Sequence, residues 1–261
     1  MSPLVFIPAA TFLVLLAGER FAPRRSQVKY SFWDWIINLS GFLVQGAVIP
    51  LLGYLIATRV LPVWIPQGFG MVKIGWWGAF LLNFVFVDFL YYWQHRLFHR
   101  FPALWKLHLC HHSSKRVDIW ITSRNTLLLH FLFVYFLLNP FFGYLVSRPE
   151  AFFAGAMLTA SLDILRHSNI DVSRLPGARI VGALLGKILV LPSAHHRHHG
   201  SDNFEGNYGA NLIIWDRMFG TFLEEKGYPE AYGVREAPSL AEQWLFPWKK
   251  RHTHNSDASQ S

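Results

Sequence analysis

Long apolar runs separated by short polar segments dominate the first two thirds of the chain. A membrane helix needs about 20 predominantly apolar residues. Five runs meet or approach this length, and we predict them as membrane helices: 3–18, 35–58, 74–94, 125–147 and 151–166. The fourth run contains Asn139-Pro140, which should break or kink its helix. This run could therefore be one bent span or the first arm of a shallow hairpin.

Basic residues next to the first run predict how the chain is oriented. Arg20, Arg24, Arg25 and Lys29 follow that run, and lysine and arginine accumulate on the cytoplasmic side of membrane proteins. Alternating sides from this point puts every histidine-rich segment on the cytoplasmic face. The shorter apolar segment 180–191 should lie along the membrane interface. The sequence thus predicts an all-α, multi-pass membrane protein with four to five membrane helices and a cytoplasmic, histidine-rich helical cap.

Composition agrees with a membrane protein. The chain is 52% hydrophobic and only 15% charged, whereas a soluble domain is about a quarter charged. The formal net charge of +8 fits cytoplasmic loops and attraction to anionic lipid. Nucleic acid binding is disfavoured because the basic residues flank apolar runs and form no single stripe. One cysteine, Cys110, excludes an intrachain disulfide and a cysteine-based metal cluster.

Histidines supply the candidate chemistry. Three sets repeat helical spacings of three or four residues, which should bring the rings of each set to one helix face. Neutral imidazole binds metal ions near neutral pH, and ligand type alone does not choose between zinc, copper, iron and nickel. The number of histidines favours two ions. The three sets are His95 and His99; His108, His111 and His112; and His195, His198 and His199.

Several motifs extend this pattern. The chain resembles the fatty acid hydroxylase / sterol desaturase superfamily of membrane di-iron enzymes, from about Phe80 to Phe222, with three histidine boxes in the same order. The further matching motifs are Asp88-x-x-x-Tyr92-Trp93-x-His95-Arg96, Leu104-Trp105-x-x-His108, His167-Ser168-Asn169, Pro192 before His195, Asn207-Tyr208-Gly209 and Trp215-Asp216-Arg217-x-Phe219-Gly220-Thr221.

The resemblance implies O2 activation at two irons and attack on an unactivated C–H bond of a lipid or sterol-like substrate. Hydroxylation is the predicted outcome, and desaturation is the alternative within the family. The apolar runs predict N-terminal membrane helices over 1–73, the resemblance implies a di-iron catalytic domain over 74–222, and a C-terminal tail over 223–261 follows. The expected iron ligands are His95, His99, His108, His111, His112, His167, His195, His198 and His199.

Polar residues near the boxes are candidates to accept the second N–H of ligand histidines, which would fix ring orientation. A capping or surface role is the alternative for each. The candidates are Asp88, Asp118, Asp163, Asn169, Asn207 and Asp216.

One position departs from the family pattern. Many members carry a histidine where this chain has Thr126. His130, one helical turn further on, or Asp163, four residues before His167, could take its place. A buried histidine with a local partner is the favoured interpretation of His130. The extra histidine of the third set, His196, should face away from the ions.

The sequence contains no nucleotide-binding glycine motif and no iron–sulfur cysteine set. Electrons should therefore come from a separate redox protein of the ferredoxin or cytochrome b5 type, with its reductase. Aromatic residues such as Tyr91 are interpreted as packing or lipid-facing, with a substrate channel as the alternative. A metal transporter is the competing class, although transporters place polar ligands near the bilayer midplane. A lipid-binding relative without catalytic activity is a further alternative.

Overall fold

The computed structural model describes residues 6–21, 23–24, 28–170, 177–202, 204–224, 227–234 and 239–248, and these contain helices and loops but no β-strand. The all-α prediction is therefore confirmed. Of the 39 residues of the predicted tail, 223–261, 19 lie outside the described residues. The elements, with short π- or 3₁₀-helical turns labelled η, are α1 (Ile7–Phe21), α2 (Phe32–Leu43), η2 (Val44–Val48), α3 (Ile49–Leu55), η3 (Ile56–Val60), α4 (Leu61–Trp64), α5 (Trp76–Leu81), η4 (Leu82–Val87), α6 (Asp88–Arg100), α7 (Pro102–His112), η5 (Ile119–Ser123), α8 (Leu129–Leu132), α9 (Val134–Leu145), α10 (Pro149–His167), α11 (Ala178–Leu185), α12 (Pro192–His198), α13 (Ile214–Met218) and α14 (Leu240–Leu245).

The second apolar run folds as one continuous helix, Phe32–Trp64, which comprises α2, η2, α3, η3 and α4. Ser31 begins it with a capping box, in which its hydroxyl accepts from the Asp34 N–H and the Asp34 carboxylate accepts from the Ser31 N–H. Within the described residues this is the one helix long and apolar enough to cross a membrane. The predicted count of four to five membrane helices stays a prediction.

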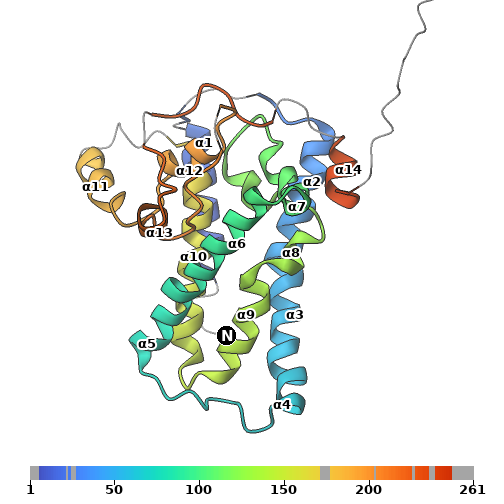
Figure 1. Ribbon diagram of the computed structural model, residues 1–261, viewed down its shortest axis with the longest axis vertical. Coiled ribbons are helices and arrows are strands. Elements are labelled where there is room, and N and C mark those ends of the chain that lie inside the picture. The colour runs from blue at the N-terminus through green and yellow to red at the C-terminus, as the bar shows by residue number, and fades with distance from the viewer. Residues whose placement is uncertain are drawn as a thin grey trace, which may run out of the picture.

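The helices form an elongated bundle with a helical cap at one end (Figure 1). Helix α10 packs against α1, α5 and α9, and α9 packs against α3. The lower part of the view contains α3, α4, α5, α9 and most of α10, whereas α7, α12 and α14 lie at the upper end. The ends of α6, α7, α10 and α12 that carry the three histidine sets and His167 meet at this upper end. The sequence segments that carry the candidate chemistry are therefore neighbours in space.

A break in the fourth apolar run lies at Phe133, between α8 and α9. The expected position was Asn139-Pro140, but α9 continues through Pro140. Phe133 adopts an extended backbone with φ −63° and ψ 139°. The side chain of Gln94 bonds to both sides of the break, donating to the Leu132 carbonyl at 2.7 Å and accepting from the Val134 N–H at 3.0 Å. This amide replaces backbone hydrogen bonds that the break removes.

Helix α11 is too short to span a membrane, as expected of the segment 180–191. It exposes apolar side chains, among them Ile180 at 70% and Leu184 at 58%. Its placement along a membrane interface stays a prediction.

Gly41 allows α2 to pack directly on the η5 turn. A Cβ atom at this position would lie 2.0 Å from the backbone oxygen of Ser123, closer than atoms can approach. Gly41→Ala should therefore destabilise the protein by about 1–3 kcal/mol, because the backbone must shift. Thermal unfolding in bicelles measures this change.

Gly46 provides the matched control on the same long helix. Nothing lies within 4 Å of a Cβ added there, so Gly46→Ala should be neutral or stabilising by up to about 1 kcal/mol. Equal unfolding temperatures for the two variants would contradict the packing argument.

Candidate metal centre

Four helices bring the nine expected histidine ligands together. Helix α6 carries two, α7 carries three, α10 ends on one, and the segment of α12 and its C-cap carries three. Helices α7 and α12 each begin with a proline, Pro102 and Pro192. Proline at the first helical position has a suitable φ angle and no N–H to leave unpaired. These starts set the helical phase of the histidines that follow.

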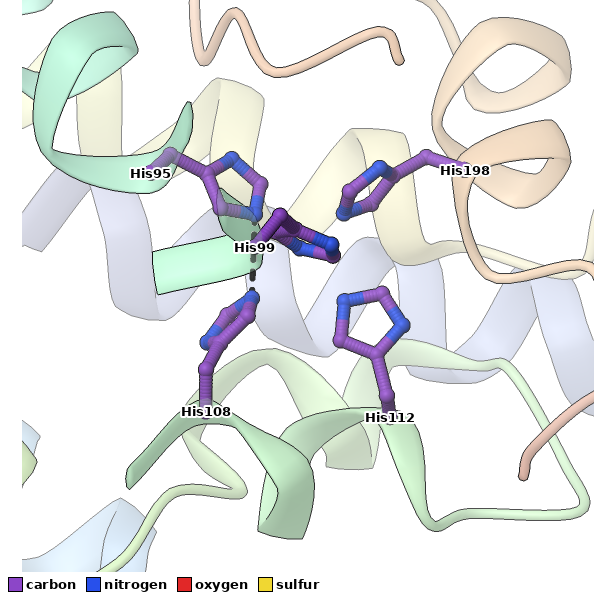
Figure 2. Close-up of side chains that lie close together, drawn as sticks. All are labelled: His95, His99, His108, His112 and His198. Carbon is purple, nitrogen blue, oxygen red and sulfur yellow. Dashed lines mark hydrogen bonds between the residues drawn. The ribbon is translucent and has the colours of Figure 1, made fainter. Parts of the chain in front are cut away.

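The nine histidines form two adjoining groups of side chains. In each group the candidate ligand atoms lie within 4.8 Å of one another. Figure 2 shows the first group, whose rings arrive from different sides and point toward a common centre. The rings of His112 and His199, one from each group, stack at 4.5 Å. The first group is His95, His99, His108, His112 and His198, and the second group is His111, His167, His195 and His199.

The division between the groups corrects one expectation. In the set on α7, and likewise in the set on α12, the rings were expected to converge on one face of their own helix. Instead His108 and His112 join the first group, whereas His111 joins the second. Consecutive residues on a helix point about 100° apart, so His111 and His112 face in different directions. Adjacent histidines thus serve two neighbouring centres.

Backbone carbonyls orient four of these rings through Nδ1. The Nδ1 atom of His95 lies 2.8 Å from the Tyr208 carbonyl oxygen, and that of His198 lies 2.7 Å from the Gly206 oxygen. In the second group, His111 Nδ1 lies 3.1 Å from the Arg124 oxygen. His167 Nδ1 lies 2.7 Å from the Asp163 backbone oxygen. A carbonyl only accepts, so each of these Nδ1 atoms carries the hydrogen.

The Nε2 atoms of such rings are then free to bind a cation. His111 Nε2 and His167 Nε2 lie 3.4 Å apart, and both are unprotonated acceptors, so they form no hydrogen bond with each other. His167 Nε2 and His195 Nε2 lie 2.8 Å apart. Nitrogens that share an ion at about 2.0–2.1 Å lie about 3–4 Å apart. The second group therefore fits a metal ion, which would occupy the point where the lone pairs converge.

Burial keeps these imidazoles neutral. Removal from water lowers the pKa of seven of the rings well below the ordinary histidine value, and it lowers the pKa of His198 to about 3. Neighbouring histidines add to the effect for the seven because protonated rings would repel one another. Neutral imidazole is the form that binds metals. The seven rings are His95, His99, His108, His111, His112, His195 and His199.

A clamped loop supplies the carbonyls that orient His95 and His198. Asp216 accepts hydrogen bonds from the Tyr208 N–H and the Gly209 N–H, both at 2.8 Å. Asn207 adopts a left-handed backbone with φ 53°, and its side chain bonds Ala194 and Leu223. Both residues thus hold the loop that contains the Gly206 and Tyr208 carbonyls.

The other predicted supporting residues contact the site less directly than expected. Asp88 is fully buried and binds the backbone N–H groups of Asn211 and Leu212 and the indole N–H of Trp215. Asp163 pairs with Arg166 at 2.5 Å, and its side-chain oxygen lies 3.4 Å from His167 Nδ1. For these residues and for Asn207, a role in holding the histidines stays a prediction.

Asn169 and Asp118 contact other parts of the fold. The backbone N–H of Asn169 donates to Glu19 at 2.8 Å. Asp118 accepts hydrogen bonds from the Tyr30 hydroxyl and from the Trp120 N–H. The role of Asn169 beside the histidines stays a prediction.

The position that departs from the family pattern contributes to local structure. Thr126 is fully buried, and its hydroxyl accepts from the Leu129 N–H at 3.2 Å. Neither His130 nor Asp163 belongs to either histidine group. His196 also lies outside them, with its Nδ1 2.8 Å from the Tyr232 hydroxyl. The buried thiol of Cys110 belongs to neither group.

A cavity of about 100 Å³ adjoins both histidine groups. Its wall includes His108 of the first group and three members of the second. Aromatic residues, among them Tyr91 and Phe133, cover other parts of the wall. Tyr91 was interpreted as a packing residue, and Tyr135 and Arg166 were missed because nothing in their spacing sets them apart. The site therefore combines a wall of histidines that could hold metal with a space lined by aromatic and polar residues.

The sequence analysis also assigned no role to Arg124, the residue before Asn125. Its guanidinium is fully buried and donates to the Cys110 carbonyl, Asn38 and Ser113. It also pairs with Asp34 at 3.0 Å. Since the Arg124 carbonyl holds His111, these contacts fix that ring as well.

The chain is an all-helical bundle that ends in two adjoining groups of buried histidines. These features place it among helical proteins with a polyhistidine site suited to metal ions. Within this class, the family model for fatty acid hydroxylase matches residues 80–221. The chain belongs to the fatty acid hydroxylase family. The predicted resemblance, from about Phe80 to Phe222, is confirmed.

Curated relatives carry names from lipid oxidation. An alkylglycerol monooxygenase of Xenopus tropicalis is 33% identical over 58% of this chain and 31% of its own length. The ornithine lipid hydroxylase OlsE of Rhizobium tropici is 37% identical over 54% of this chain and 41% of its own. An alkylglycerol monooxygenase of Danio rerio is 31% identical over 81% and 45%. The chain spans less than half the length of each. No solved structure showed a significant match.

Proposed function

We propose that this chain is an O2-dependent di-iron oxygenase that hydroxylates a C–H bond of a membrane lipid or sterol-like substrate. The observation that carries the proposal is the convergence of carbonyl-oriented, neutral histidines beside an aromatic cavity. The names of the relatives, monooxygenase and hydroxylase, support hydroxylation over desaturation.

The two histidine groups would each hold one iron. The first would use its five histidines and the second its four. When bound, the irons would supply O2 activation and the oxidising power for C–H cleavage. The protein's own part is to bring the nine imidazoles together, to orient four of them through backbone carbonyls, and to hold the substrate beside aromatic side chains that exclude water.

The same proposal includes a multi-pass membrane protein with its site on the cytoplasmic face. The long helix Phe32–Trp64 supports it, because only 6% of its most apolar stretch is buried within the protein. Exposed apolar residues on that helix, such as Leu51 and Trp64, would contact lipid chains. The basic residues in the last turn of α1 and after it, including Arg20 and Lys29, favour the cytoplasmic side at that end.

Electrons would come from a separate redox protein of the ferredoxin or cytochrome b5 type. The chain has a single cysteine, so it does not hold an iron–sulfur cluster on cysteine ligands of its own. A soluble donor reaches a site at the end of the bundle more readily than one at mid-membrane.

Metal content and product analysis test the proposal. The iron-loaded protein in nanodiscs should bind about two irons per chain and transfer one atom of labelled O2 into a lipid when a reductant is present. Mass spectrometry detects the product, and omission of O2 or reductant provides the controls. An unsaturated product without label would indicate a desaturase. Bound iron without any oxidised lipid, over a panel of lipids and donors, would indicate a metal-binding or transport protein.

A further inference from the structure

Six buried polar atoms in residues that line the cavity have no protein partner. Two are Nδ1 atoms of the histidine groups, in His108 and His195, and the other four are Asn125 Oδ1, His130 Nε2, the Tyr135 hydroxyl and Arg166 Nε. An unpaired buried polar group lowers stability, and such groups are rare in folded proteins. Asn125, His130 and Tyr135 belong neither to the histidine groups nor to an ion pair, so their unpaired atoms are open to a molecule bound in the cavity.

These atoms belong to the end of the cavity near the histidines. The ring of Tyr135 stacks on Tyr91 at 5.2 Å, and the ring of Tyr91 lies 5.4 Å from His95. Asn125 directly follows Arg124, whose carbonyl holds His111. A group bound between Tyr135 and Asn125 would therefore be close to the candidate metal ions.

Apolar side chains in the same wall could contact a hydrocarbon chain. Phe133 and Phe136 lie at and just after the α8–α9 break, and Ile49 faces them from the long helix. Gln45 is the one polar residue that the long helix adds to this wall. The cavity wall thus combines these apolar residues with polar and charged ones, among them Thr122, Asp163 and Arg166.

We propose that Tyr135 and Asn125 determine specificity by binding a hydroxyl oxygen of the lipid substrate next to the carbon that reacts. A hydroxyl group donates one hydrogen and accepts others. The Tyr135 hydroxyl donates to it and Asn125 Oδ1 accepts from it, whereas His130 can take either role according to its tautomer. The substrate class is therefore a long-chain lipid with a hydroxyl-bearing head. The chemical reaction at that carbon rests on the proposed function, but the binding preference does not.

Binding of two lipids that differ in one group tests the proposal. The probes are 1-hexadecanol and heptadecane, in which a methyl group replaces the hydroxyl. Zinc-loaded protein in bicelles prevents turnover, and calorimetry gives the dissociation constants. Tyr135→Phe removes a single oxygen from the cavity. Tyr54→Phe, on the exposed face of α3, removes the same atom outside the cavity and is the matched control.

Wild-type protein and Tyr54→Phe should bind 1-hexadecanol more tightly than heptadecane. Tyr135→Phe should weaken 1-hexadecanol binding about 5- to 30-fold and leave heptadecane unchanged, as expected for one buried hydrogen bond. Equal binding of 1-hexadecanol by wild type and Tyr135→Phe would overturn the proposal, as would equal binding of the two probes by wild type.

A separate measurement distinguishes this proposal from the proposed function. Iron-loaded protein is supplied with reductant, labelled O2 and 1-hexadecanol. Tyr135-dependent binding without any oxidised product would reject the oxygenase and leave the recognition site standing. Oxidised product with binding that is indifferent to Tyr135 would leave the oxygenase standing and reject the recognition site.

Discussion

Replacing His111 with alanine should reduce bound iron from about two ions to about one per chain and abolish lipid oxidation. His111 is one of four histidines in the second group, so its loss leaves three. Loss of a group behind a metal ligand already reduces affinity or activity about 10- to 100-fold, and loss of a ligand should exceed this. Elemental analysis of purified protein and product analysis by mass spectrometry measure the two effects.

The two histidine groups should differ in how much iron they lose when one histidine is replaced. His198→Ala leaves four histidines in the first group, so iron in that group should be retained better than iron in the second group after His111→Ala. His196→Ala is the control, because its ring bonds Tyr232 and the Ser168 carbonyl and lies outside both groups. It should keep about two ions. Full iron and full activity after His111→Ala would reject the second group as a metal site.

Asp88→Ala should destabilise the protein by about 3–5 kcal/mol, the second large effect that we expect. The Asp88 carboxylate is the acceptor for the buried N–H groups of Asn211 and Leu212 and for the indole of Trp215. Removing it leaves three donors without a partner. Unfolding by denaturant in bicelles measures the loss.

The control for Asp88 is an exposed carboxylate. Glu150 pairs with Arg148 at 3.8 Å, and both side chains are more than half exposed. Glu150→Ala should therefore change stability by less than about 0.5 kcal/mol. Asp88→Ala should also weaken metal binding, because Asn211 continues the loop whose carbonyls orient His95 and His198. A stability change below about 1 kcal/mol would mean that the three donors find other partners.

The sequence was sufficient to predict the all-α class and the family. It also predicted which nine histidines come together, because helical spacing and chain order depend on local sequence alone. The positions at which helices begin and end were harder to predict from the sequence. The interruption lies at Phe133 and not at Asn139-Pro140, since a distant side chain, Gln94, supplies the hydrogen bonds that permit it.

The partners of the histidine rings could not be predicted from residue types. Carboxylates and amides near the boxes were the expected acceptors, but the structure uses backbone carbonyls of Tyr208, Gly206 and Arg124. Every residue has a carbonyl, so composition carries no signal for this role. The polar residues act one step further away, as Asp216 does by holding the loop.

Gln94 links the interruption between α8 and α9 to the first histidine through neighbouring positions in the chain. Its amide bonds a carbonyl before the interruption of α8 and α9 and an N–H after it, and it directly precedes His95. Glutamate would lack the donor and lysine the acceptor, so either change would leave one backbone group unpaired in an apolar setting. A change at Gln94 would therefore disturb both the α8–α9 interruption and the backbone that carries the first histidine.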